Sequence, residues 1–269
     1  VVVRRKIVDA RYLSPVVPAT HRARFTVAEG VRVLPPGALP GLGAQREALG
    51  EAPRRFVVLG AGKTAMDTLL WLLGQGVPAA QLQWVMPRDS WLINRVTTQN
   101  GPEFFHEAVG GQAAQLEAMA QATSTEDLFT RLEACGMMLR IDPARWPTMF
   151  HFATTSEAEV AELRRVHDVV RLGRVQAITA TEMQLAQGRV PVASGTLFID
   201  CTASAVEPRP LQPVFQPGRI VLQIVRMPLP TFSAALTAWV EAHRDDDRAR
   251  NALCAPVPFP HSLAGYAPA

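Results

Sequence analysis

Lysine is almost missing from this chain of 269 residues, in which 27 positions are lysine or arginine but only Lys6 and Lys63 are lysine. The formal net charge is +3 and is spread along the chain without basic blocks, so the charge pattern gives no indication of nucleic-acid binding. Cysteine is also scarce, because Cys135, Cys201 and Cys254 lie far apart and no metal-binding spacing occurs. We therefore expect no bound metal and a reducing, cytoplasmic location.

Long apolar runs are missing as well, although 48% of the residues are hydrophobic. No run is long enough to cross a bilayer and no signal peptide is recognisable, so we expect no membrane association. The two tyrosines, Tyr12 and Tyr266, do not begin a Tyr-x-x-x-Lys pair, which excludes the short-chain type of dehydrogenase. The length fits one large or two modest globular domains with a sizeable core.

The most informative stretch of the sequence is RRFVVLGAGKTAMDT, which runs from Arg54 to Thr68. Residues 56–59 form a short apolar run that predicts a buried strand. Residues 63–74 predict a helix with small and apolar side chains on one face, ending at a glycine-rich C-cap. The turn between them reads G-x-G-x-x-A, and the order of strand, glycine-rich turn and helix is typical of a dinucleotide-binding unit.

Each small residue of this turn has a physical role in such a unit. Gly60 permits the tight turn, Gly62 lets a pyrophosphate approach the backbone, and Ala65 allows close packing of helix against strand. The free N–H groups and the positive dipole end of the helix would face the phosphates. The structural alternative is a glycine turn without a ligand. Residues 62–64 also match the end of a P-loop, but the first glycine of that motif would fall at Val57, which excludes a P-loop nucleotidase.

The cofactor preference depends on the end of the next predicted strand, residues 82–86. An NAD-binding unit usually has Asp or Glu there, which bonds the ribose 2′-hydroxyl. Here Arg88 is well placed for a 2′-phosphate, with Ser90 as a second donor. Asp89 is the alternative, as a ribose carboxylate one or two places late, and Arg88 with Asp89 could also be an ordinary exposed pair. We favour NADP over NAD.

The middle of the chain is predicted to change from helix to strand. Residues 91–167 are predicted to be mainly helical, with helices over 112–122, over 125–135 and after a capping box at Ser156. Short β runs over 168–203 predict a parallel strand followed by a small antiparallel meander. The candidates to line a pocket, most of which we assign to the core, are Trp91, Trp146, Met149, Phe150 and Phe152. No catalytic side chain is assigned, because His106, His151 and His167 lack the spacing of a metal site or a triad.

The two ends of the chain are predicted to hold short strands between Pro-rich linkers. Residues 1–13 predict one or two strands, and residues 14–53 predict a linker with one short strand near 31–34. Residues 204–218 predict a second linker, followed by a strand at 220–225, a helix at 231–243 and a surface tail from residue 244.

Taken together, these pieces resemble the two-dinucleotide-binding-domain flavoproteins, especially flavin-dependent monooxygenases and related bacterial FAD/NAD(P)-dependent oxidoreductases. In that family an NADP-binding domain is inserted into an FAD-binding domain through two crossing strands. Residues 57–95 resemble the first β-α-β of the inserted domain, residues 6–21 resemble the segment that leaves the flavin domain, and residues 198–203, FIDCTA, resemble the returning strand.

The resemblance implies an α/β fold with a Rossmann-like nucleotide-binding domain, a small antiparallel meander and partial flavin-domain elements. Residues 1–53 would hold flavin-domain strands and a crossing linker, residues 54–203 the NAD(P)-binding domain, and residues 204–269 the return to the flavin-type domain. The residues that would hold the cofactor are Gly60, Ala61, Gly62, Lys63, Thr64, Ala65, Arg88 and Ser90.

One departure from the family limits what this chain does alone. Members bind FAD through a separate G-x-G-x-x-G near their N-terminus, and that fingerprint is absent here. The main FAD site is therefore expected outside this chain. The expected function is binding of NADP(H) for hydride transfer to FAD and an unknown small substrate. The alternative is a non-catalytic NAD(P)-binding module or sensor subunit. The expected partner is a missing flavin-domain half or a second copy of the chain.

Overall fold

The computed structural model describes residues 5–42, 53–204, 206, 209–260 and 262–266. The chain divides into two compact units, unit 1 from Val1–Val16 with Ser204–Ala269 and unit 2 from Val17–Ala203. Unit 2 is thus one continuous stretch of sequence between the two parts of unit 1. The predicted strand start at residues 1–4 and the linker at 43–52 lie outside the described residues, and the three-part domain division stays a prediction.

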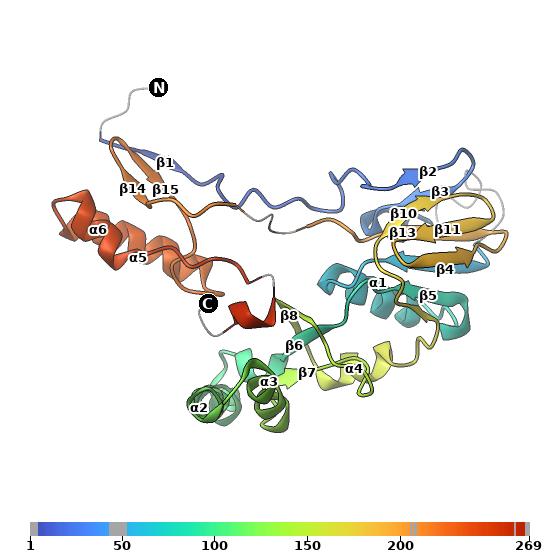
Figure 1. Ribbon diagram of the computed structural model, residues 1–269, viewed down its shortest axis with the longest axis horizontal. Coiled ribbons are helices and arrows are strands. Elements are labelled where there is room, and N and C mark those ends of the chain that lie inside the picture. The colour runs from blue at the N-terminus through green and yellow to red at the C-terminus, as the bar shows by residue number, and fades with distance from the viewer. Residues whose placement is uncertain (1–4, 43–52, 205, 207–208, 261, 267–269) are drawn as a thin grey trace. The chain divides into compact units, whose positions relative to one another are not determined.

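Unit 2 is built on a parallel sheet with the strand order β3-β13-β4-β5-β9, in which every neighbouring pair runs parallel (Figure 1). Its strands are β3 (Arg32–Leu34), β13 (Thr196–Asp200), β4 (Arg55–Leu59), β5 (Leu82–Val85) and β9 (Val169–Val170). Helix α1 (Lys63–Gly74) follows β4 directly. The predicted strands at 56–59 and 82–86 and the helix from residue 63 are therefore confirmed, as is a mixed α/β architecture.

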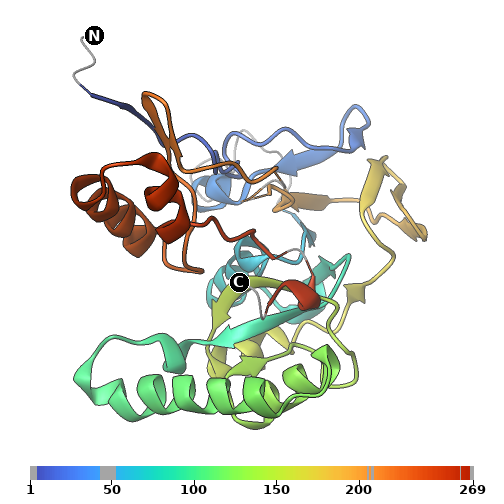
Figure 2. The same ribbon diagram turned by 60° about the vertical axis from the view of Figure 1, so that its left-hand side comes forward.

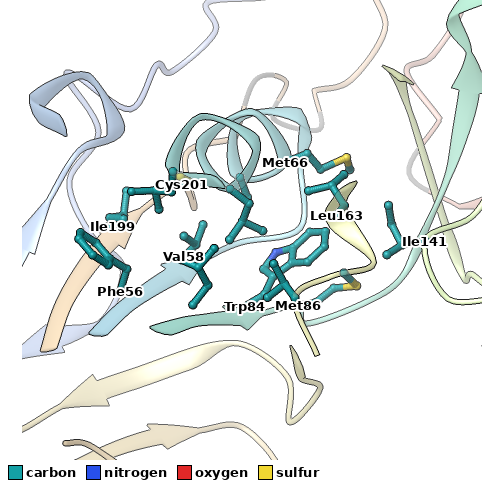
Figure 3. Packing of buried hydrophobic residues seen from close by; sticks show 14 of the residues in the cluster. Phe56, Val58, Met66, Trp84, Met86, Ile141, Leu163, Ile199 and Cys201 are labelled. Atoms are coloured by element: carbon teal, nitrogen blue, oxygen red, sulfur yellow. The ribbon is translucent and has the colours of Figure 1, made fainter. Parts of the chain in front are cut away.

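The two faces of this sheet bury separate apolar clusters. Alternate residues of β4 point to opposite sides, so Phe56 and Val58 pack toward α1 while Val57 and Leu59 pack on the other side. Figure 3 shows the first cluster, in which the indole of Trp84 lies among side chains from β4, α1 and the end of β13. The predicted inner face of α1 is confirmed, since its Ala65, Leu69 and Leu72 are buried.

The second face is covered by a smaller sheet with the order β12-β11-β10-β2. Its strands are β12 (Gly188–Pro191), β11 (Glu182–Leu185), β10 (Val175–Ile178) and β2 (Thr26–Val27). β10, β11 and β12 pair antiparallel, which confirms the predicted meander. β2, which pairs parallel with β10, was not expected from the sequence.

The prediction of a mainly helical segment over 91–167 is wrong in part, because a further sheet with the order β7-β6-β8 lies there. Its strands are β6 (Ser90–Asn94), β7 (Met138–Leu139) and β8 (Met149–Thr155). The pairing of β6 with β8 shifts register between Trp91 and Ile93, and this bulge breaks the alternation that would have identified β8. The helices of this part, seen from another side in Figure 2, are α2 (Phe105–Gln121), α3 (Thr125–Ala134) and α4 (Glu157–Leu163).

The described residues of unit 1 form a sheet with the order β1-β15-β14 and two α-helices. These elements are β1 (Ile7–Asp9), β14 (Phe215–Gln216), β15 (Arg219–Val221), α5 (Pro230–His243) and α6 (Asp247–Leu253). The predicted surface tail from residue 244 is wrong, because Asp246 caps α6 and Arg250 is buried. Arg250 pairs with Asp247 at 2.7 Å and with Glu241 at 3.2 Å, so ion pairing buries this one residue of a charged run that otherwise stays largely exposed. Short 3-10 turns lie at Pro36–Leu42, Ala79–Gln81, Arg95–Thr98, Pro102–Phe104 and Leu263–Gly265.

Candidate functional site

The turn after β4 requires glycine at its first position. Gly60 has a φ of +121°, and a Cβ there would lie 2.6 Å from the carbonyl oxygen of Cys201. The Gly60 N–H donates to the carbonyl of Val85 at 3.0 Å, and the Trp84 indole N–H donates to the carbonyl of Gly60 at 2.7 Å. The turn is therefore fixed by β5 on one side and pressed against the end of β13 on the other.

The second glycine of the turn, Gly62, has open space around it, in contrast to Gly60. Gly62 is the N-cap residue of α1 with a φ of −84°, and a Cβ there would meet nothing within 4 Å. Its carbonyl accepts from the N–H groups of Ala65 and Met66. Among the described residues, no side chain caps this helix end, the first turn holds no acidic residue, and the N–H groups of Lys63 and Thr64 have no acceptor. An uncapped, open helix N-terminus is a site for an anion.

The remaining residues of the predicted loop differ in what they offer. Ala65 is fully buried against the sheet, as its role as the third small position requires. The carbonyl of Thr64 accepts from the Thr68 hydroxyl at 2.7 Å. The ammonium of Lys63 pairs with Asp67 on the next turn of α1. Ala61 packs partly buried against the main cluster.

Glu159 brings a negative charge close to the start of α1. Its carboxylate accepts from the N–H of Ser156 at 2.7 Å and from Arg95 at 2.8 Å, and it lies 3.8 Å from the Lys63 ammonium. Burial alone would raise the pKa of Glu159, but the Ser156 and Arg95 hydrogen bonds and the charge of Lys63 outweigh it and lower the pKa to about 2. Glu159 is therefore ionised at neutral pH, and it completes the predicted capping box at Ser156, which is confirmed.

Two neighbouring charged residues in the loop after β5, Arg88 and Asp89, have different surroundings. Asp89 accepts two hydrogen bonds from Arg171, at 2.9 and 3.1 Å, and this bond raises the pKa of Arg171. The hydroxyl of Ser90 lies within donor distance of the carbonyl of Met149, 3.2 Å away, where β6 pairs with β8. Arg88 is exposed, and its guanidinium has no hydrogen bond or ion pair within the described part of the chain.

A second arginine, Arg174, follows β9 at the same carboxyl edge of the sheet, and it was not expected from the sequence. The Met86 N–H donates to the carbonyl of Val170, so the loops that leave β5 and β9 run side by side. Partial desolvation lowers the pKa of the exposed Arg88, and the positive charge of Arg174 lowers it further. Among the described residues neither guanidinium has a carboxylate partner. The signal in the sequence was the spacing Arg171-x-x-Arg174 directly after a parallel strand.

The carboxyl end of β13 holds a further polar group beside the turn. The hydroxyl of Thr202 donates to Asp200 at 2.6 Å, and Nε2 of His21 lies 3.1 Å from the same hydroxyl oxygen. Cys201, which lies between Asp200 and Thr202 in the sequence, is buried with its Sγ 3.5 Å from the Thr68 hydroxyl oxygen. Burial raises the pKa of the Cys201 thiol to about 11, so this cysteine is a packing residue and no nucleophile at neutral pH.

Within the described residues, no cluster of three or more His, Cys, Asp or Glu side chains could hold a metal ion. No helix of the same residues is both long and apolar enough to pass through a bilayer. The arrangement at the carboxyl edge of the parallel sheet thus offers an open helix N-terminus, two arginines that have no acidic partner among the described residues, and a hydroxyl held by two buried groups. These features suit a ligand that carries phosphates.

Comparison with known proteins gives relatives of greater length. No protein-family model matches the sequence. Proteins of Mycobacterium tuberculosis and Mycobacterium bovis, each named only as an uncharacterized protein, are 48% identical over 260 residues, which cover 97% of this chain and 47% of each relative. The chain therefore spans about half the length of the curated relatives that it matches, and it is similar to mycobacterial proteins whose names state no activity.

Proposed function

We propose that unit 2 binds NADP(H) as a Rossmann-like pyridine-nucleotide domain. The observation that carries this proposal is the open N-terminus of α1, which follows β4, the central strand of the parallel sheet, through Gly60 and Gly62. A Cβ at Gly62 would fill the space through which a pyrophosphate reaches the free N–H groups. The backbone of residues 60–65 would hold the pyrophosphate, with the helix dipole favouring its negative charge.

The preference for NADP over NAD rests on the charges after β5. In NAD-binding units a carboxylate usually accepts the ribose 2′-hydroxyl, but here the charge of Asp89 is paired with Arg171 through two hydrogen bonds. A 2′-phosphate needs cations without acidic partners, and Arg88 with Arg174 meets that requirement among the described residues. Ser90 would be a minor contact, because its hydroxyl hydrogen is directed to backbone carbonyls.

The larger assignment, to a flavin-dependent oxidoreductase or monooxygenase, rests on the resemblance and on two observations. Unit 2 interrupts unit 1 in sequence, as an inserted NADP domain would. The chain also matches only 47% of its relatives' length, which leaves room for a flavin-binding half in them. The described residues offer no second glycine fingerprint for FAD, so in this proposal the main FAD site lies outside this chain.

In this proposal NADPH, when bound, supplies a hydride. The chain's own residues bind the pyrophosphate, select the 2′-phosphate and hold the ligand at the carboxyl edge of the sheet. The flavin, the small substrate and a cytoplasmic location belong to the whole protein and are proposals for it. A non-catalytic NAD(P)-binding module or sensor subunit is the second candidate.

The experiment that tests the proposal replaces the arginines with alanine one at a time and measures the binding of NADPH and NADH. Arg88→Ala should weaken NADPH binding about 10- to 100-fold and leave NADH binding nearly unchanged, because a lost charged contact to phosphate costs roughly 1.5–3 kcal/mol. Arg174→Ala should act in the same direction. Arg189→Ala is the matched control, because Arg189 is exposed on β12 and pairs with Glu182. Equal losses for NADPH and NADH would remove the role of Arg88.

A further inference from the structure

The hydroxyl of Thr202 is held in one orientation by two buried side chains. Asp200, the last residue of β13, accepts both the Thr202 hydroxyl at 2.6 Å and the Thr202 backbone N–H at 2.9 Å. Nε2 of His21 lies 3.1 Å from the hydroxyl oxygen, and the His21 side chain is only 5% exposed. The single hydroxyl hydrogen is directed to the carboxylate, so His21 must donate its Nε2 proton to Thr202.

This arrangement leaves the Thr202 hydroxyl able to accept one more hydrogen bond. A hydroxyl has one hydrogen and two lone pairs, and here the hydrogen goes to Asp200 while one lone pair accepts from His21. The second lone pair is left, and Thr202 is only half-buried. The group therefore presents an oriented hydrogen-bond acceptor, suited to an N–H or O–H donor of a ligand.

The position of this acceptor follows from the strand order. β13 and β5 lie on opposite sides of β4, and the chain passes from β4 through α1 to β5 before it returns to β13. The strand order thus reverses between β13 and β4, and ligands of open α/β sheets bind at the carboxyl ends of the strands where it reverses. The Cys201 N–H donates to the carbonyl of Leu59 at 2.9 Å, which holds Thr202 beside the Gly60 turn.

We propose that Thr202, positioned by Asp200 and His21, binds the nicotinamide riboside half of the dinucleotide. This inference rests on the proposed NADP(H) function. With the pyrophosphate at Gly62 and the 2′-phosphate half beside Arg88 on the β5 side, the other half of the ligand extends over the end of β13. Its carboxamide and ribose hydroxyls are donors, and they match the acceptor that Thr202 offers. Thr202 is the contact residue, whereas Asp200 and His21 are positioning residues.

The test compares two ligands that share the adenosine half. The affinities of NADPH and of adenosine 2′,5′-bisphosphate, which lacks the nicotinamide riboside, are measured by calorimetry for the whole chain. Thr202→Val should weaken NADPH binding about tenfold, as expected for one lost hydrogen bond, and leave bisphosphate binding within about twofold. Thr202→Ser should restore NADPH binding. Thr196→Val is the control, since Thr196 lies at the other end of β13 and its hydroxyl donates to the Ala193 carbonyl.

The possible outcomes separate this inference from the function on which it rests. Equal weakening of both ligands by Thr202→Val would show that the group only supports the fold, and no weakening of either would show that Thr202 is not a contact; each result overturns the inference. If wild-type protein binds the bisphosphate but NADPH gains nothing over it, the inference also fails while the NADP site stands. If wild-type protein binds neither ligand, both fail together.

Discussion

The two glycines of the turn predict opposite phenotypes for substitutions of similar size. Gly60 has a φ of +121°, and a Cβ there would overlap the backbone oxygen of Cys201 at 2.6 Å. Gly62 has ordinary extended dihedrals and open space around its missing Cβ. Gly60→Ala should therefore damage the fold, whereas Gly62→Val should spare the fold and damage binding.

The magnitudes follow from these surroundings. For Gly60→Ala, backbone strain of about 1–3 kcal/mol and overpacking of about 1–3 kcal/mol add up. At about 2–4 °C per kcal/mol for a unit of this size, the Tm should fall by at least about 4 °C. Gly62→Val loses a favourable N-cap residue, at a cost of about 1 kcal/mol and a few degrees. Its branched side chain fills the approach to two N–H groups, and losing two charge-assisted bonds to phosphate should weaken binding about 100-fold or more.

The assay is a thermal melt and an NADPH titration on wild type, Gly60→Ala and Gly62→Val. We expect Gly62→Val to melt close to wild type and yet to lose affinity for both NADPH and NADH. Unchanged affinity in that variant would show that no phosphate approaches Gly62. A wild-type Tm in Gly60→Ala would refute the close contact between the turn and the end of β13.

Two further predictions concern charged residues near the turn. Asp89→Asn should leave NADH affinity unchanged and lower the Tm by a few degrees, because it removes the charge that Arg171 pairs with; a selective loss of NADH binding would instead make Asp89 a ribose ligand. Glu159→Gln should lower the Tm at pH 7 but not near pH 2. Since the folded pKa of Glu159 is lowered to about 2, the stability from its charge is present above pH 4.5 and is lost as the pH falls toward 2. A Tm difference that does not change between pH 7 and pH 2.5 would contradict this.

The sequence was sufficient to predict those helices, strands and caps that are determined by residues close together in the chain. The strand at 56–59, the helix from Lys63 and the capping box at Ser156 are all set by residues close in sequence, and each is confirmed. The turn residues are likewise local, so Gly60 could be assigned to a tight turn from spacing alone. Its requirement for glycine, however, comes from Cys201, which is distant in sequence.

Features that depend on pairing between distant segments could not be predicted. β8 was missed because its bulge at Phe152, with a φ of +56°, disrupts the alternation of a strand. Helix α6 was missed because its charges suggested solvent, whereas Arg250 is buried by ion pairs with residues of α5 and α6. The pairing of Asp89 with Arg171 was invisible for the same reason, since 82 positions separate them.

The candidate site likewise contains some residues that a local motif identified and others that only the fold brings together. The glycine turn and Arg88 were identified from the sequence as a possible cofactor site, and that role stays a prediction. His21, Thr202 and Arg174 were not identified from the sequence. They become candidate site residues only because the strand order brings the ends of β13, β4, β5 and β9 to one edge of the sheet. No motif joins these residues in the sequence.

The most direct test of the central claim is a calorimetric titration of the purified chain with NADPH, NADH and FAD in parallel. The account predicts that NADPH binds, that NADH binds more weakly, and that FAD does not bind to this chain alone. Tight FAD binding would contradict the placement of the flavin site outside the chain. Failure of NADPH to bind would contradict the account itself, and the turn from Gly60 to Ala65 would then be a structural element without a ligand.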